Sequence, residues 1–283
     1  MKAVLPAAGL GTRLLPITKE LPKEMLPIFV RSADEGLCLK PMIQAVYEQL
    51  YDFGFREFVI VVGRGKRAIE DHFTPDRGFI DLLRMKNKHS LAAELESFYN
   101  KILTSNIVFV NQPEPRGFGD AVLAARPVID GPFLLHAGDT YIISKGDEHL
   151  KRLFDVHKRF NADATLLIQY VEDPRAYGVV EGDEVSEGVT LVRSLEEKPE
   201  RPKTNLAIMP IYIFDSVIFK ALEVTKPGKG GEIQLTDAIQ KLVDWGLKVY
   251  AVRLRPDEQR LDIGTPQTCW ESLTISYNYF KKE

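Results

Sequence analysis

The sequence predicts an α/β fold in which a mixed, mostly parallel sheet is flanked by helices. Short runs of β-forming residues alternate with amphipathic stretches through the first half of the chain, which is the pattern of parallel strands joined by helices. The second half holds strand-like runs without long helices between them, which indicates antiparallel pairing. With 283 residues, 45% hydrophobic and 27% charged, the composition is that of a globular protein with one continuous core. We therefore expect a single domain over residues 1–283.

The first half supplies the elements of the parallel part of the sheet. The predicted strands are residues 3–6, 58–62, 107–110 and 133–136. The predicted helices are residues 41–53, 64–72, 91–103 and 120–125. One face of the third helix is apolar, because large hydrophobic residues recur every three or four positions: Leu91, Leu95, Phe98 and Ile102. That face needs a partner in the core.

The second half extends the sheet with strands of mixed direction. The predicted strands are residues 165–171, 179–181, 189–196, 206–214 and 249–254. We expect turns at Gly182, Asp183 and Gly188, which are common turn residues. The predicted helices are residues 215–223, 232–245 and 265–282, and Glu232 would open the second of them.

Charge and cysteine content exclude several classes of partner. The formal net charge is only −3, so no overall field attracts nucleic acid. No apolar run approaches the roughly 20 residues that cross a bilayer, so we expect no membrane contact. Cys38 and Cys269 lie far apart, which excludes a cysteine metal cluster and favours a reducing compartment. A cytoplasmic location is therefore expected.

A glycine-rich loop follows the first predicted strand, at the edge where open α/β sheets bind ligands. Gly9 and Gly11 lack side chains where a backbone must approach phosphates closely, and successive amides can cradle the oxygens. Arg13 adds a planar, permanently charged donor for phosphate. The alternative interpretation is a Rossmann or other β-turn-α glycine loop used for packing. The spacing lacks both the third glycine of a dinucleotide fingerprint and the Lys-Ser/Thr ending of a P-loop, so neither standard motif fits.

Three further residues stand in patterns suited to nucleotide chemistry. Lys23 lies between two prolines in the compact element at residues 22–27. Gln112 follows the strand at 107–110, and its amide offers the donor and acceptor that a pyrimidine imide edge requires; loop capping is the alternative interpretation. Asp139 ends an apolar strand, where a carboxylate is costly unless it is paired or binds a cation; a helix N-cap is the alternative. Asp139 is therefore a candidate magnesium ligand.

The run from Gly9 to Pro27 resembles the signature of the sugar-phosphate nucleotidyltransferases, and most of the chain looks like their bacterial UTP-glucose-1-phosphate uridylyltransferase branch. The resemblance implies the fold of the nucleotide-diphospho-sugar transferases. It implies that Arg13 and Lys23 bind the β- and γ-phosphates and stabilise the leaving pyrophosphate. It also implies a set of nucleotide-binding residues: Ala8, Gly9, Gly11, Thr12, Gln112 and Gly117.

The same resemblance implies a sugar-phosphate side and a metal site. Glu197 would accept sugar hydroxyls, Lys198 would hold the sugar phosphate, and the backbone of Gly178 would meet the hexose. Without the resemblance, the Glu-Glu-Lys run at 196–198 is typical of a solvated turn. Asp262 resembles the family's second metal-proximal aspartate, so Mg²⁺ at Asp139 and Asp262 is the expected cofactor.

The expected reaction joins UTP to glucose 1-phosphate, giving UDP-glucose and pyrophosphate. Residues 1–140 would form the nucleotide-binding half, residues 141–264 the sugar-phosphate half, and residues 265–283 a C-terminal helix. A thymidylyltransferase making dTDP-glucose is the main alternative, and a catalytically silent nucleotide-sugar sensor is another. A homo-oligomer is expected. Two departures from the family, Met209-Pro210 and a long segment at residues 29–39, leave the sugar less certain than the reaction.

Overall fold

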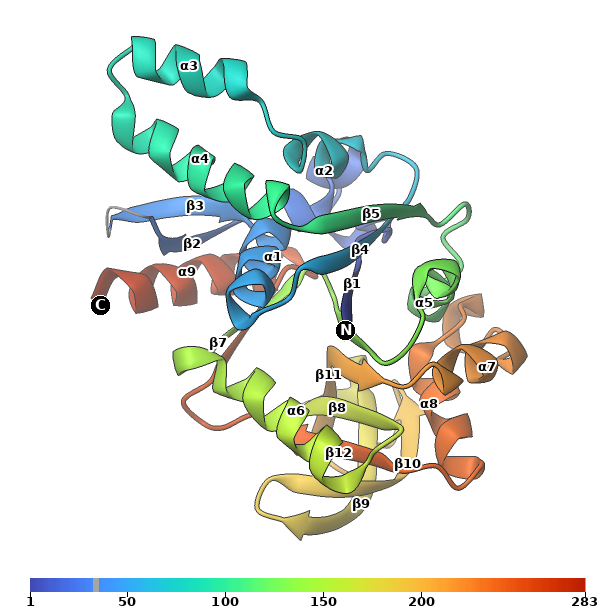
Figure 1. Cartoon of the computed structure of the whole chain (residues 1–283). Helices are drawn as coiled ribbons and strands as arrows, with labels where there is room; N and C mark the ends of the chain where they lie inside the picture. The colour runs from blue at the N-terminus through green and yellow to red at the C-terminus, as the bar shows by residue number, and fades with distance from the viewer. Residues whose placement is uncertain (33–35, 283) are drawn as a thin grey trace.

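The computed structural model describes residues 1–32 and 36–282 of the chain, and within them a nine-stranded sheet runs through the molecule (Figure 1). The strands of this sheet are β1 (Lys2–Pro6), β4 (Glu57–Val62), β5 (Asn106–Asn111), β6 (Phe133–His136), β8 (Ala164–Tyr170), β9 (Gly178–Ser186), β10 (Val189–Glu197), β11 (Leu206–Phe214) and β12 (Val249–Arg253). Their spatial order is β5-β4-β1-β6-β11-β8-β12-β10-β9.

Strand direction divides the sheet into two parts. β5, β4, β1 and β6 run parallel to their neighbours. β11 is antiparallel to both β6 and β8, β12 is parallel to β8, and β10 is antiparallel to both β12 and β9. The parallel part comes from the first half of the chain and the mixed part from the second half, which confirms the predicted fold class.

Helices cover both faces of the sheet (Figure 1). They are α1 (Met42–Phe53), α2 (Arg67–His72), α3 (Arg77–Met85), α4 (His89–Leu103), α5 (Phe118–Ala124), α6 (Glu148–Phe160), α7 (Val217–Val224), α8 (Leu235–Asp244) and α9 (Pro266–Lys282). Ala3 and Leu5 of β1 belong to the same core cluster as α1 and α6, whereas Val4 belongs to the cluster of α5 and α7, as the alternation of a pleated strand requires. Within the described residues, no helix is long and apolar enough to cross a bilayer.

A smaller core lies beside the main sheet, under α9. It is built on two antiparallel strand pairs, β2 (Pro27–Arg31) with β3 (Leu37–Pro41) and β7 (Thr140–Ile143) with β13 (Gln259–Asp262). Ile28, Leu261 and Ile263 are fully buried there, and Ile275 of α9 packs against them. One face of the C-terminal helix is therefore core, while Trp270 on the same helix is 67% exposed.

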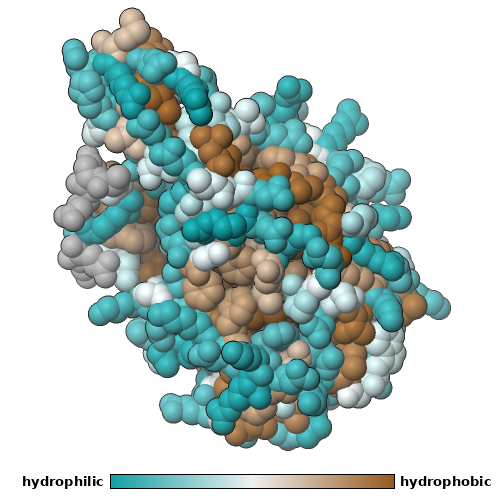
Figure 2. Space-filling view, viewed as in Figure 1, coloured by the Kyte–Doolittle hydropathy of each residue, from teal (hydrophilic) through white to brown (hydrophobic). Residues whose placement is uncertain are grey.

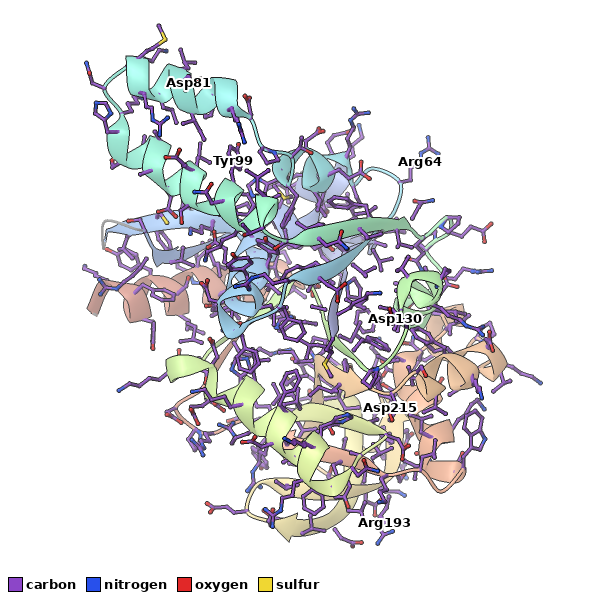
Figure 3. The ribbon with its side chains drawn as sticks, viewed as in Figure 1. Arg64, Asp81, Tyr99, Asp130, Arg193 and Asp215 are labelled. Atoms are coloured by element: carbon purple, nitrogen blue, oxygen red, sulfur yellow. The ribbon has the colours of Figure 1, made fainter. Side chains whose placement is uncertain are left out.

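Helices α3 and α4 form an arm that stands out from the rest of the molecule, with hydrophobic and hydrophilic side chains mixed on its surface (Figures 1 and 2). Arg84 of α3 pairs with Glu96 of α4 at 2.7 Å, and Asp81 lies on the α3 side of the arm (Figure 3). Tyr99 joins the arm's small apolar cluster to the main core. The helix predicted at 91–103 is confirmed, whereas α3 was not predicted.

Three expectations about the second half were wrong in detail. Gly182 and Asp183 do not form a turn, because β9 continues through both to Ser186 and pairs with β10. The turn lies at Gly188 alone, which has a φ of 70°. Residues 181–185 of β9 are exposed, so no alternation marked them as a strand. Glu232 does not open a helix, because α8 begins at Leu235.

Candidate active site

A cleft of about 840 Å³ opens at the carboxyl edge of the parallel strands, where the loops after β1, β5 and β6 meet residues of the second half. It brings together every site residue predicted from the sequence: Ala8, Gly9, Gly11, Thr12, Arg13, Lys23, Gln112, Gly117, Asp139, Gly178, Glu197, Lys198 and Asp262. A volume of this size suits a ligand as large as a nucleotide sugar. Residues up to 254 positions apart in the sequence, from Ala8 to Asp262, thus line one cleft, as the predicted site requires.

The glycine-rich loop reaches into the cleft from the end of β1. Gly11 has a φ of 67°, a left-handed conformation that favours glycine, and Thr18 Oγ1 donates a hydrogen bond of 2.8 Å to its carbonyl. A Cβ on Gly9 would lie 3.6 Å from Lys23 Cε, so the loop passes directly over that lysine. Arg13 is exposed at the mouth of the cleft. The loop can therefore meet an anion with backbone amides and a guanidinium together.

Lys23 and Asp139 form a partly buried ion pair within the cleft. Burial alone would lower the pKa of Lys23, but the charges of Asp139 and Glu24 outweigh burial and hold that pKa above its usual value. Burial alone would raise the pKa of Asp139, and Lys23 reverses this effect, so the carboxyl has a lowered pKa. Both side chains are therefore charged where an anionic ligand would enter.

A second ion pair, which was not predicted, is buried and involves Glu24, the sequence neighbour of Lys23. Lys66, from the loop after β4, donates to Glu24 Oε2 at 2.8 Å, and the two side chains are only 7% and 2% exposed. Burial raises the pKa of Glu24, while Lys66 and Lys23 oppose that rise. Glu24 adjoins Lys23 in a single 3-10 turn, so the pair fixes the turn that presents Lys23.

The two candidate metal carboxylates are held together by backbone pairing. Asp262 ends β13 opposite Thr140 of β7, and the amide of Ile263 donates to the carbonyl of Asp139 at 3.0 Å. Burial, and then the charge of Asp139, raise the pKa of Asp262. The carboxylates of Asp139 and Asp262 repel each other, so binding of a cation beside them is favoured.

The donor set fits a hard divalent cation that keeps other ligands. Within the described residues, no group of three or more histidine, cysteine, aspartate or glutamate side chains is arranged to hold a metal. A cation at Asp139 and Asp262 would therefore take its remaining ligands from water or from a bound phosphate. Mg²⁺ characteristically binds in this way, through one or two carboxylates together with substrate phosphates.

Gln112 is buried at the end of β5 with its amide orientation fixed. Its Nε2 donates to Asp120 Oδ2 at 2.7 Å and to the carbonyl of Gly117 at 3.2 Å. Gly117 has a φ of 114°, and a Cβ there would lie 2.8 Å from Glu232 Cβ and from the carbonyl oxygen of Ile233. The glycine is thus required by packing against residues 232–233, a reason that the sequence did not reveal.

The opposite side of the cleft presents Glu197 and Lys198. Thr236 Oγ1 donates to Glu197 Oε2 at 2.6 Å, and Lys198 Nζ lies 3.2 Å from Glu197 Oε1. Lys198 has a φ of 45°, which is uncommon outside glycine, and its amide donates to the carbonyl of Tyr177 at 2.9 Å. A Cβ on Gly178 would lie 2.7 Å from Thr236 Oγ1. Residues 177–178, 197–198 and 236 therefore form one packed unit rather than a solvated turn.

Several cleft residues were given little or no weight in the sequence analysis. Glu232 lines the cleft instead of capping a helix, and Pro210 lines it with Ile208 and Tyr212 as an apolar wall. The carbonyl of Pro210 accepts from the amide of Ala137 at 2.9 Å, so this departure from the family lies beside the loop after β6.

Arg260 also lines the cleft and was missed completely. It belongs to β13, a four-residue strand in which positions 260 and 262 share a face. The spacing Arg-x-Asp in a short strand was the signal that could have identified it. It lay undetected because residues 259–262 were not recognised as a strand.

Comparison with known proteins agrees with this geometry. The family model for nucleotidyl transferases matches residues 2–276. The chain is 35% identical over 286 residues to a UTP-glucose-1-phosphate uridylyltransferase of Pseudomonas aeruginosa, covering 99% of this chain and 97% of that protein. It is 40% identical over 247 residues to the enzyme of the same name from Bacillus subtilis strain 168, covering 85% and 80% respectively.

A solved structure is similar throughout its length. A UDP-glucose pyrophosphorylase complexed with UDP-glucose superposes with a TM-score of 0.83 and 33% identity, covering all of this chain and 99% of that one. These findings confirm both the fold and the resemblance to the uridylyltransferase branch. The protein is therefore a member of the nucleotidyl transferase family.

Proposed function

We propose that the protein transfers the uridylyl group of UTP to glucose 1-phosphate, giving UDP-glucose and pyrophosphate. The relatives and the superposed structure carry names that describe this reaction. The observation that carries the proposal is the shared cleft, which is lined by the Lys23–Asp139 pair, by Gln112 and by Glu197. In this proposal the cleft takes the base, the phosphate chain and the sugar together.

The nucleotide occupies the side formed by residues 1–140 in this proposal. Amides of Ala8, Gly9, Gly11 and Thr12 contact the triphosphate, and Gln112 with the backbone at Gly117 reads the base. Because Asp120 fixes the Gln112 amide, the oxygen of that amide can accept from the imide N–H of a pyrimidine. Uracil and thymine share that imide, so dTTP is the competing nucleotide.

The sugar phosphate occupies the side formed by residues 141–264. Glu197 accepts sugar hydroxyls, the backbone at Gly178 faces the hexose, and Lys198 neutralises the phosphate. These roles are supported by the fixed positions of the two residues. Thr236 donates a hydrogen bond to Glu197, and the carbonyl of Tyr177 accepts one from the amide of Lys198.

The reaction follows from positioning and charge. A phosphate monoester has a second pKa near 6, so it is largely a dianion at neutral pH and needs no general base. One of its oxygens forms a bond to the α-phosphorus of UTP, and the bond from that phosphorus to the bridging oxygen of pyrophosphate breaks. Arg13 and Lys23 bind the β- and γ-phosphates and stabilise the leaving pyrophosphate. Lys198 neutralises negative charge on the attacking sugar phosphate.

Asp139 and Asp262 hold Mg²⁺ in this proposal. When bound, the ion supplies positive charge that neutralises phosphate oxygens as negative charge builds up. The ion pair between Lys23 and Asp139 supports the arrangement, because it shows that the site already balances a carboxylate against a cation.

Pyrophosphate release tests the function. We expect release from the purified protein only with Mg²⁺, a nucleoside triphosphate and a sugar 1-phosphate together. UTP and dTTP, each with glucose or galactose 1-phosphate, then rank base and sugar. Release without a sugar phosphate would overturn the transfer reaction. Absence of release with every pair, combined with tight UDP-glucose binding, would favour the sensor.

Assembly and location stay predictions. A homo-oligomer is supported by two aromatic side chains of α9, Trp270 and Tyr277, which are 67% and 37% exposed. The mass in solution, measured by light scattering, tests it, and a monomer at working concentration would contradict it. The expected cytoplasmic location is tested by fractionation of the cells that make the protein.

A further inference from the structure

Arg260 is a buried cation on the wall of the cleft that the reaction described above does not use. It lies on β13, opposite Ile142 of β7, and its side chain is 12% exposed. Because Asp262 lies two positions further along the strand, both side chains project from the same face. Arg260 therefore enters the cleft beside a candidate metal carboxylate.

The guanidinium of Arg260 makes few contacts for a group so well buried. Its Nη2 donates to the hydroxyl of Tyr177 at 2.9 Å, and its carbon lies 5.2 Å from the centre of the Tyr177 ring. Its Nη1 lies 3.7 Å from Asp262 Oδ1, too far for a hydrogen bond. Among residues 1–32 and 36–282, no other acceptor bonds to this guanidinium, so a cleft-lining group with five donors makes a single hydrogen bond to the protein.

Tyr177 places Arg260 on the sugar side of the cleft. The Tyr177 hydroxyl binds Arg260, while the Tyr177 carbonyl accepts from the amide of Lys198 at 2.9 Å. Gly178, the next residue, faces the proposed hexose. One tyrosine is thus bonded to the guanidinium of Arg260 and to the backbone of Lys198, and both residues line the same cleft.

From this arrangement we propose that Arg260 binds the phosphate of the sugar 1-phosphate, with Lys198, and that Tyr177 orients its guanidinium. A planar fork of donors that makes one hydrogen bond within the described residues suits two oxygens of one phosphate, whereas Lys198 contributes a mobile point charge. The carboxylate of Asp262, 3.7 Å from Nη1, attracts the guanidinium toward the candidate metal carboxylates. This inference rests on the proposed function, because it names a residue that binds the second substrate.

Steady-state kinetics with each substrate varied in turn test the role of Arg260. We expect Arg260→Met to raise the KM for glucose 1-phosphate about 10- to 100-fold, the loss expected for a charge-assisted hydrogen bond, while the KM for UTP changes less than about twofold. Arg260→Lys retains the charge without the fork and should recover part of the loss. Tyr177→Phe should give a smaller rise in the same KM.

Arg152 provides a matched control, because it is a buried arginine outside the cleft that binds Glu258 through both terminal nitrogens. Arg152→Met should lower the melting temperature without changing the ratio of the two KM values. Circular dichroism shows whether each variant folds, and Arg260→Lys answers the question if Arg260→Met does not fold.

Three results would overturn the inference. One is an equal rise in both KM values, another is a rise in the KM for UTP alone, and the third is a Tyr177→Phe variant that matches Arg260→Met. Failure of the proposed function gives a different result, since the wild-type protein would then show no turnover in the same assay.

Discussion

Lys23 and Asp139 are in direct contact as a partly buried ion pair that lines the cleft, although they lie 116 positions apart in the sequence. One comes from a 3-10 turn after the glycine-rich loop and the other from the loop after β6. The pair joins the proposed phosphate and metal sites, so changes to it should affect stability and turnover in separable ways.

Breaking this pair should cost both stability and turnover. Lys23→Met and Asp139→Asn each leave one charged partner buried, which we expect to lower the free energy of unfolding by about 1–3 kcal/mol. Each should also reduce kcat by about 10²- to 10³-fold, because a group that meets phosphate charge is lost. Urea unfolding and pyrophosphate release measure the two effects.

The double variant separates these roles. Lys23→Met combined with Asp139→Asn removes both charges, so stability should recover in part while turnover stays low. Turnover within about threefold of wild type in both single variants would show that the pair is only structural.

The Lys66–Glu24 pair should matter for folding more than any exposed ion pair. Lys66→Met leaves the carboxylate of Glu24 buried without its partner, which we expect to cost about 3–5 kcal/mol at pH 7. Burial already raises the pKa of Glu24, and this variant should raise it further. A raised carboxyl pKa favours the folded state at low pH, so the cost should shrink as pH falls from 7 toward 5.

Urea unfolding at several pH values measures this cost. Arg175→Met, which removes an exposed pair with Asp173, serves as the control and should leave the free energy of unfolding close to that of the wild type. A Lys66→Met cost that is small, or that grows as pH falls, would contradict the interpretation.

The orientation of Gln112 should depend on Asp120. Asp120→Asn replaces a carboxylate that can only accept with an amide that can also donate, so the Gln112 amide loses its fixed direction. We expect the KM for UTP to rise about tenfold, while the KM for glucose 1-phosphate stays within about twofold. Arg116 also binds Asp120, so Arg116→Met is the control for loss of that ion pair alone. An unchanged KM for UTP would remove Gln112 as the base reader.

Acid should destabilise the protein through its buried histidines. Burial lowers the pKa of His136 to about 4, and burial together with the charge of His136 lowers that of His149 to about 3. Unfolded histidine titrates near 6.5, so the unfolded state binds more protons below that pH and stability falls as pH drops from 6.5 to 4. For His136 alone the loss approaches about 3 kcal/mol.

The pH dependence of urea unfolding checks this account. His149→Gln should flatten the slope between pH 6.5 and 4, whereas His89→Gln on the exposed arm should leave it unchanged. A slope that survives the loss of His149 in full would assign acid sensitivity to other groups.

Local patterns were enough to predict the parallel strands and the loops that follow them. β1, β4, β5 and β6 are apolar runs bounded by turn residues, and the ends of parallel strands meet at one edge. The residues brought together there, such as Gly9, Gln112 and Asp139, could therefore be predicted to share a site.

Residues defined by distant pairing could not be predicted in this way. Nothing in the sequence around Glu24 and Lys66 indicates that these two charged residues are buried. Their pairing is seen only in the folded structure. β13 is four residues long and gains its structure from β7, so Arg260 carried no periodic signal. Helix α6 was missed because polar residues dominate it, although Leu150 and Leu153 are fully buried.

Phosphorus NMR of a single reaction mixture tests the central claim most directly. With Mg²⁺, UTP and glucose 1-phosphate, the account predicts that signals of UDP-glucose and pyrophosphate grow in equal amounts, and that a chelator stops both. Mixing pyrophosphate with UDP-glucose should regenerate UTP. Formation of UDP or UMP with inorganic phosphate, or unchanged spectra from folded protein that still binds UDP-glucose, would contradict the claim.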